Sequence, residues 1–188
     1  MSKPIKSLAD ALQARLTDGA LPGELEGFGD AERATADDGS NYVGQIQDGK
    51  RQGLGVAEMK DGARQAGEWK YSQLNGLGTE RATDGERFEG QWHDGQPNGL
   101  GVREKPGVER AEGNFVAGTL DGPGVRRLFG EPSIVRIGEW RNGALEGAGV
   151  ETTGDKERYE GVFRAGKRRG YGQVTGTGDK VMSGRWDD

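Results

Sequence analysis

Few residues in this chain could carry covalent or acid–base chemistry. Its 188 residues include one histidine, His93, and no cysteine. Disulfides, thiolate metal sites and cysteine nucleophiles are therefore excluded. A Ser-His-Asp triad needs a histidine that is oriented by an acid, and no such set can be assembled around His93 with any specificity. We expect no enzymatic activity, no bound metal and no cofactor.

The paired glycines do not predict a nucleotide site either. Each pair, such as Gly99 and Gly101, is expected inside a β-hairpin, whereas a dinucleotide fingerprint lies between a strand and a helix. Gly166-Lys167 is followed by Arg168, where a phosphate loop needs a Ser or Thr that ligates Mg²⁺. The acidic residues have neither the spacing of an EF-hand nor that of a catalytic carboxylate pair.

One segment could bind anions through its charge. Residues 159–181 contain five basic and two acidic side chains. The candidate contacts with an anionic lipid or phosphoinositide headgroup are Arg164, Lys167, Arg168 and Arg169. Lipid-binding clusters contain about 4–8 basic residues, but the net charge of the chain is −5, which opposes attraction to polyanions. Membrane-surface attachment is therefore kept as an alternative function, and no nucleic-acid binding is expected.

The elements that carry these residues repeat along the chain. A glycine recurs at intervals of 23, 23, 23, 25, 23 and 23 residues, at Gly44, Gly67, Gly90, Gly113, Gly138, Gly161 and Gly184. Two residues after each glycine comes a large apolar side chain, at Ile46, Trp69, Trp92, Phe115, Trp140, Phe163 and Trp186. A fixed period of this length is typical of a protein built from stacked structural repeats.

Each repeat is expected to be a β-hairpin. In the first repeat, Tyr42, Gly44 and Ile46 recur with the two-residue period of a strand, and Asp48-Gly49 predicts a tight turn. We expect the valines and leucines of the second strands to share the aromatic face, and charged residues to cover the opposite face. Tyr71-Ser72 lacks a turn glycine, so we expect that hairpin to be longer or looser.

The predicted fold class is all-β, an elongated single-layer antiparallel meander of hairpin repeats of about 23 residues, curled and twisted. Leucines at helical spacing predict a short amphipathic helix over 1–18, and 19–41 are expected to form a degenerate first repeat or cap. The expected full repeats are 42–64, 65–87, 88–110, 111–135, 136–158 and 159–181, with a final half repeat at 182–188.

The repeated phrase resembles the MORN repeat (membrane occupation and recognition nexus). The match is carried by Phe88–Gly101, F-E-G-Q-W-H-D-G-Q-P-N-G-L-G, and by Tyr159–Gly172, Y-E-G-V-F-R-A-G-K-R-R-G-Y-G. The resemblance covers about 42–188, and the opening aromatic is replaced at Gln65, Ala111, Arg136 and Met182. It implies a curled sheet whose one face forms a groove, and it implies partner-helix or peptide binding, dimerisation or contact with anionic lipids.

A long apolar face is more than a monomer normally leaves exposed. The leading hypothesis is a non-enzymatic scaffold that binds a partner helix or peptide in the groove through Tyr42, Trp69, Phe88, Trp92, Phe115, Trp140, Tyr159 and Phe163. These rings could also be ordinary core residues. Self-association, as a homodimeric structural protein, is a further alternative through Leu8, Leu12, Met182 and Trp186. A cytoplasmic location is expected, with attachment to a membrane surface as its variant.

Overall fold

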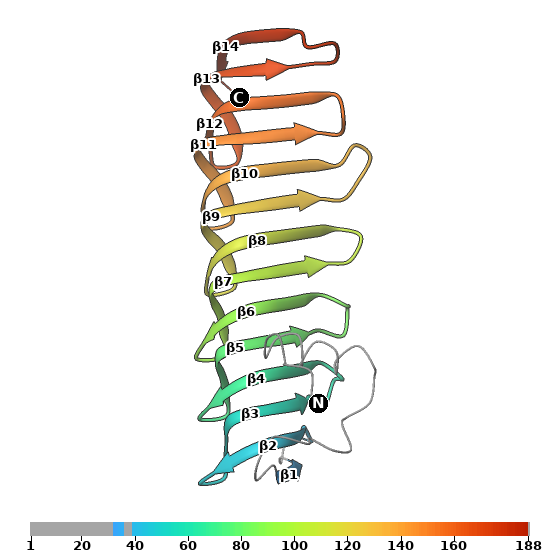
Figure 1. Cartoon of the computed structure of the whole chain (residues 1–188), viewed down its shortest axis with the longest axis vertical. Coiled ribbons are helices and arrows are strands. Elements are labelled where there is room, and N and C mark those ends of the chain that lie inside the picture. The colour runs from blue at the N-terminus through green and yellow to red at the C-terminus, as the bar shows by residue number, and fades with distance from the viewer. Residues whose placement is uncertain (1–31, 36–38, 188) are drawn as a thin grey trace, which may run out of the picture. The chain divides into compact units, whose positions relative to one another are not determined.

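The computed structural model describes residues 32–35 and 39–187 (Figure 1). The helix expected over 1–18 lies outside the described residues, and so does most of the cap expected over 19–41. The described residues form strands and turns and no helix, and the all-β prediction is confirmed. The chain divides into two units, residues 1–97 and 98–188, and each unit is described by itself.

Within each unit the strands lie side by side in the order of the chain, and neighbouring strands pair antiparallel. The strands of the first unit are β1 (Glu32–Thr35), β2 (Asn41–Gln47), β3 (Lys50–Glu58), β4 (Arg64–Lys70), β5 (Gln73–Arg81) and β6 (Arg87–His93). Those assigned to the second unit are β7 (Gln96–Lys105), β8 (Glu109–Val116), β9 (Thr119–Leu128), β10 (Ile134–Arg141), β11 (Ala144–Thr153), β12 (Glu157–Arg164), β13 (Lys167–Thr175) and β14 (Val181–Asp187).

Two-residue turns join the strands within each hairpin. Asn142 and Gly143 both have positive φ, 49° and 74°, which is the backbone of a type I′ turn and matches the twist of the strands. Tyr71 and Ser72 adopt the same conformation, with φ of 51° and 67°, so the expectation of a longer or looser hairpin is wrong. The amide of Tyr71 donates to Gln52 Oε1 at 3.1 Å and that of Ser72 to the Arg51 carbonyl at 3.0 Å, and these bonds offset the strain.

A row of glycines crosses each unit, because each glycine is the cross-strand partner of the next. The row in the first unit is Gly44, Gly55, Gly67, Gly78 and Gly90. The row in the second unit is Gly101, Gly113, Gly124, Gly138, Gly149, Gly161, Gly172 and Gly184. Side chains of large residues lie over these rows, and the missing Cβ atoms give them room.

The first strand of a hairpin shifts its register just after the row glycine, as in β4, β8 and β12. Such a bulge bends the strand and leaves backbone groups unpaired, and in Figure 1 the ribbons bend on the way to their tight turns. Polar side chains satisfy the freed amides. Gln45 Oε1 accepts from the Leu54 amide at 3.0 Å, and Glu68 Oε1 accepts from the Leu77 amide at 3.2 Å.

The aromatic residues of each unit share one face of its sheet, called the ring face below, with leucines packed between them. Phe115, Tyr159 and Leu145 are fully buried there, and Phe163 is 1% exposed. Edge-to-face pairs add to this packing, as between Tyr159 and Phe163, whose ring centroids are 5.2 Å apart. The core of each unit is therefore a thin layer of rings against backbone.

The valines and leucines that stand next to the row glycines in the second strands lie on the opposite face. The expectation that they share the ring face is therefore wrong for Leu54, Val56, Leu77, Leu100, Val102, Val125 and Val150. Val125 pairs with Ile137, and Ile137 pairs with Val150, one residue away from the glycine row. Since successive residues of a strand point to opposite faces, a residue next to a row glycine points away from the rings. The opposite face also carries the expected charged pairs, such as Arg110 with Glu112 at 2.6 Å.

Candidate binding surface

The rings that were predicted to line a partner groove are buried in the single chain. Each of these side chains is 5% exposed or less: Tyr42, Trp69, Phe88, Trp92, Phe115, Trp140, Tyr159 and Phe163. They form the core of the sheet, and their contact with a partner stays a prediction. An incoming partner would therefore meet the side chains that cover the rings.

In the second unit those side chains form a row that contains several charged residues. Each member is the cross-strand partner of the next, across strands β7 to β14: Arg103, Ala111, Arg126, Arg136, Glu151, Tyr159, Val174 and Met182. We call these eight residues the charged row. It runs beside the glycine row, two residues away along each strand, and therefore lies on the ring face.

Glu109 joins two arginines of the charged row. Arg103 Nη2 donates to Glu109 Oε1 at 3.0 Å, and Arg126 Nε donates to Glu109 Oε2 at 2.9 Å. Burial raises the pKa of Glu109, but the hydrogen bonds and charges of Arg126 and Arg103 outweigh burial and hold the pKa below its ordinary value. The Glu109 side chain is 12% exposed, against 25% for Arg103 and 30% for Arg126.

Glu151 joins a second pair of arginines in the same manner. Arg136 Nε donates to Glu151 Oε2 at 2.5 Å, and Arg168 Nη2 donates to Glu151 Oε1 at 2.7 Å. Arg168 Nη2 also donates to Glu157 Oε1 at 2.6 Å. Burial raises the pKa of Glu151, but the hydrogen bonds from Arg136 and Arg168 outweigh burial and lower it. Glu151 is 9% exposed, so its charge lies beneath the guanidinium groups.

Arginines also cover the aromatic rings directly. Arg168 Cζ lies 4.7 Å from the centroid of the Tyr159 ring, and Arg103 Cζ lies 5.9 Å from that of Phe115. In the first unit Arg51 Cζ lies 5.4 Å from the Tyr42 ring and 5.2 Å from the Trp69 ring. A guanidinium group over an aromatic face is attracted to it while its edges remain accessible. Arg51, Arg103 and Arg168 therefore lie between the aromatic rings and the solvent.

The equivalent row of the first unit carries less charge. Its members are Tyr42, Ala57, Gln65, Glu80 and Phe88. Gln65 Nε2 donates to Glu80 there, in the place that Arg136 and Glu151 take in the second unit. Burial raises the pKa of Tyr42 to about 12, although the charge of Arg51 acts in the opposite direction. An open hollow of about 1040 Å³ also lies in this unit, lined by residues that include Gln52, Glu68 and Trp69.

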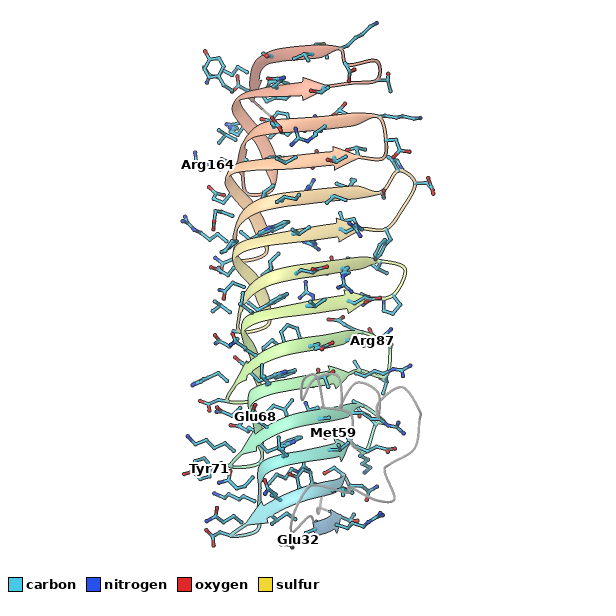
Figure 2. The ribbon with its side chains drawn as sticks, viewed as in Figure 1. Glu32, Met59, Glu68, Tyr71, Arg87 and Arg164 are labelled. Carbon is cyan, nitrogen blue, oxygen red and sulfur yellow. The ribbon has the colours of Figure 1, made fainter. Side chains whose placement is uncertain are left out.

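The four predicted lipid-binding residues do not form one cluster. Arg164 and Lys167 pair across a tight turn, and Arg164 lies at the turn edge of the second unit (Figure 2). Arg168 is bound to Glu151 and Glu157 on the ring face, and Arg169 Nη1 donates to the Asp187 carbonyl at 2.7 Å. Alternation along β13 separates the side chains, and their role in lipid binding stays a prediction.

The structure describes two of the four residues that were predicted for self-association. Leu8 and Leu12 lie outside the described residues. Met182 is 67% exposed, whereas the Trp186 ring packs edge-on against Tyr159 with centroids 5.1 Å apart. β14 pairs with β13, and within residues 32–35 and 39–187 no strand pairs with its other edge.

The single histidine of the chain lies in β6 and is exposed. The His93 side chain is 68% exposed, and its nearest described ionic partner is Asp94, 3.4 Å from Nδ1. No group of three metal-ligating side chains occurs among the described residues. The described ranges also contain no helix of the length and apolarity needed to cross a bilayer.

Consecutive bent hairpins, a row of glycines and a ring face covered by side chains define the class of the protein, a β-hairpin repeat protein. The family model of the MORN repeat matches residues 42–64, 66–87, 88–107, 112–128, 137–158 and 159–178. The chain belongs to the MORN repeat family, as its sequence resemblance indicated. No curated protein matches the chain by sequence. MORN repeats are associated with protein interaction and with membrane lipids.

The charged row was missed in the sequence because its members come from different places in the repeat. Arg136 stands where other repeats have an aromatic residue, and the sequence marks it only as a departure from the motif. Arg103, Arg126 and Glu151 occupy one repeat position that is Ala57 in the first repeat. Aligning the repeats by their glycines would have found these residues as charges at a ring-face position.

Proposed function

We propose that this chain is a non-enzymatic interaction module, and that a peptide or helix of a partner protein lies on the ring face of the second unit. The single observation behind the proposal is the charged row, whose guanidinium groups are held by Glu109 and Glu151 above buried rings. Because these guanidinium groups are already held by hydrogen bonds, their side chains would lose little conformational entropy when a partner binds.

Site-specific photo-crosslinking tests the proposal with a matched control in the same strand. A photoreactive residue is placed at Ile134, on the ring face two residues from Arg136, or at Val135, its neighbour on the opposite face. We expect crosslinks to a partner from position 134 and none from 135, in variants with the unfolding midpoint of the unmodified chain. Equal crosslinking from both positions, or from neither, would contradict the proposal.

Two alternatives from the sequence are tested separately. Anionic-lipid attachment rests on Arg164 and Lys167 at one turn, and sedimentation with anionic vesicles at several salt concentrations tests it. Homodimer formation rests on the exposed Met182 and the edge of β14, and Met182→Lys is expected to shift a dimer towards monomer in light scattering. A cytoplasmic location, at a membrane surface or away from it, stays a prediction.

A further inference from the structure

The ring face of the second unit carries more positive than negative charge. Glu109 serves two arginines, Arg103 and Arg126, and lies opposite Lys105, the cross-strand partner of Glu109. Glu151 and Glu157 together serve Arg136 and Arg168. Five cations therefore face three carboxylates, while the whole chain has a net charge of −5. The net charge of this face is therefore positive, whereas that of the whole chain is negative.

The excess belongs to the Glu109 group, where Arg103, Lys105 and Arg126 face one carboxylate, and Arg126 lies where this group meets the Glu151 group. Arg126 and Arg136 are direct cross-strand partners on β9 and β10. Like charges directly opposite each other destabilise a strand pair. Each guanidinium group binds a different carboxylate, Arg126 binding Glu109 and Arg136 binding Glu151. No described carboxylate bridges the two guanidinium groups to each other.

The accessible atoms at this point belong to the arginines. The Arg126 and Arg136 side chains are 30% and 27% exposed, whereas those of Glu109 and Glu151 are 12% and 9% exposed. A partner therefore meets the positive groups first, and the covered carboxylates hold those groups in place. Guanidinium groups in fixed positions suit planar two-oxygen acceptors, which they bind with paired hydrogen bonds.

We propose that the charged row binds an acidic segment of a protein partner, with one Asp or Glu carboxylate of that segment placed between Arg126 and Arg136. The inference rests on the proposed function and specifies its partner. A carboxylate carries one negative charge, which matches a small local excess. A phosphorylated headgroup carries several charges and is usually met by a larger group of free basic side chains, whereas these arginines are already hydrogen-bonded and partly buried.

The fold itself supplies the variant that tests this step. Arg136→Gln recreates the Gln65 and Glu80 pair at the equivalent place of the first unit, so the sheet accommodates it. Arg126→Ala recreates Ala57 in the same way and serves as a second variant if the first is unstable. Arg110→Gln removes the same charge from the opposite face, where Arg110 pairs with Glu112, and is the control.

The binding experiment uses an array of labelled peptides of stated composition with the full-length chain. Each peptide of Ala, Leu and two to four Glu residues has a twin with Gln in place of every Glu. We expect binding to Glu peptides and not to their Gln twins, weakened about tenfold or more by Arg136→Gln and less than twofold by Arg110→Gln. Circular dichroism and urea midpoints establish that each variant is folded.

Several outcomes would overturn the inference. They are binding that is equal for Glu and Gln peptides, binding that Arg136→Gln and Arg126→Ala leave unchanged, and no peptide binding together with salt-sensitive sedimentation on vesicles containing phosphatidylserine. If photo-crosslinking from position 134 captures a partner that Arg136→Gln still binds, the interaction module stands and its acidic specificity fails. If neither crosslinking nor peptide binding occurs, both proposals fail.

Discussion

Trp69 and Trp92 lie at equivalent positions of successive repeats, yet only one of the two indole groups is hydrogen-bonded. Trp69 Nε1 donates to the Gly55 carbonyl at 2.9 Å, and Trp140 repeats this bond with the Gly124 carbonyl at 3.0 Å. The buried Nε1 of Trp92 has no partner among the described residues. Both Trp69 and Trp92 are 4% exposed, so burial does not distinguish the two sites.

Replacing each of these tryptophans by phenylalanine separates the bond from the packing. Trp69→Phe removes a buried hydrogen bond and leaves the Gly55 carbonyl unpaired, whereas Trp92→Phe removes an unpaired donor. We expect Trp69→Phe to lower the free energy of unfolding by about 1–2 kcal/mol more than Trp92→Phe. Urea unfolding followed by circular dichroism measures both. Equal losses would show that ring volume alone determines the stability.

The glycine row predicts a second pair of variants. A Cβ at Gly172 would lie 2.5 Å from the Tyr159 hydroxyl oxygen and 2.6 Å from its ring carbons, so the buried ring or the strand would have to shift. A Cβ at Gly184, the cross-strand partner of Gly172, would have its nearest contact with Trp186 at 3.8 Å. Neither position requires a positive φ, so the two substitutions differ in the space they meet.

We expect Gly172→Ala to destabilise the chain by about 1–3 kcal/mol, because it overpacks the core. Gly184→Ala is expected to be neutral or to stabilise by about 0.4–1 kcal/mol, because alanine restricts the unfolded chain. Thermal unfolding of the two variants under the same conditions measures the contrast. A stable Gly172→Ala protein would show that Tyr159 can leave the glycine row at little cost.

The repeat architecture could be predicted from the sequence because it depends on glycines at fixed positions, which few other folds require. Glycines at a fixed period, with turn signals such as Asn142-Gly143 between them, leave little choice but consecutive hairpins. The conformation of Tyr71-Ser72 was not readable, since the bonds to Gln52 and Arg51 come from the neighbouring hairpin. Local propensity alone disfavours positive φ at both residues.

The face of each residue was harder to predict than its strand. Bulges after the row glycines and the offset between paired strands decide which side chains lie above the rings, and neither is visible in a two-residue period. The valines were therefore placed on the wrong face, and Arg103, Arg126 and Glu151 were not recognised as one row. The sequence identified the aromatic residues of the ring face, but it did not identify the arginines that cover them.

Arg168 combines three interactions that lysine cannot reproduce. Its guanidinium group binds Glu151 and Glu157 and stacks on the Tyr159 ring at 4.7 Å. Arg168→Lys keeps the charge and loses the planar fork, so we expect a loss of about 1–2 kcal/mol in the free energy of unfolding. Arg158→Lys, at an exposed pair with Glu160, is the control and is expected to cost less than about 0.5 kcal/mol. Equal effects in denaturant titrations would mean that Arg168 acts through its charge alone.

The acid sensitivity of the fold is expected to depend on Glu151. Arg136 and Arg168 lower the pKa of its folded-state carboxyl below the ordinary 4.5, so the unfolded chain takes up this proton at a higher pH than the folded chain. The stabilisation is therefore complete above about pH 4.5 and is lost as the pH falls through the folded-state pKa. Glu109, whose pKa is also lowered, contributes in the same direction.

Urea midpoints measured between about pH 7 and pH 3 test this dependence. Glu151→Gln is expected to lower stability at pH 7, because it removes a charge that two arginines share, and to make the further loss below about pH 4.5 shallower than in the wild type. Glu160→Gln removes a carboxylate that is 48% exposed and is expected to keep the steep loss of the wild type. If Glu151→Gln and the wild type lose stability in parallel on acidification, the coupling of Glu151 to Arg136 and Arg168 is not what holds this face together at neutral pH.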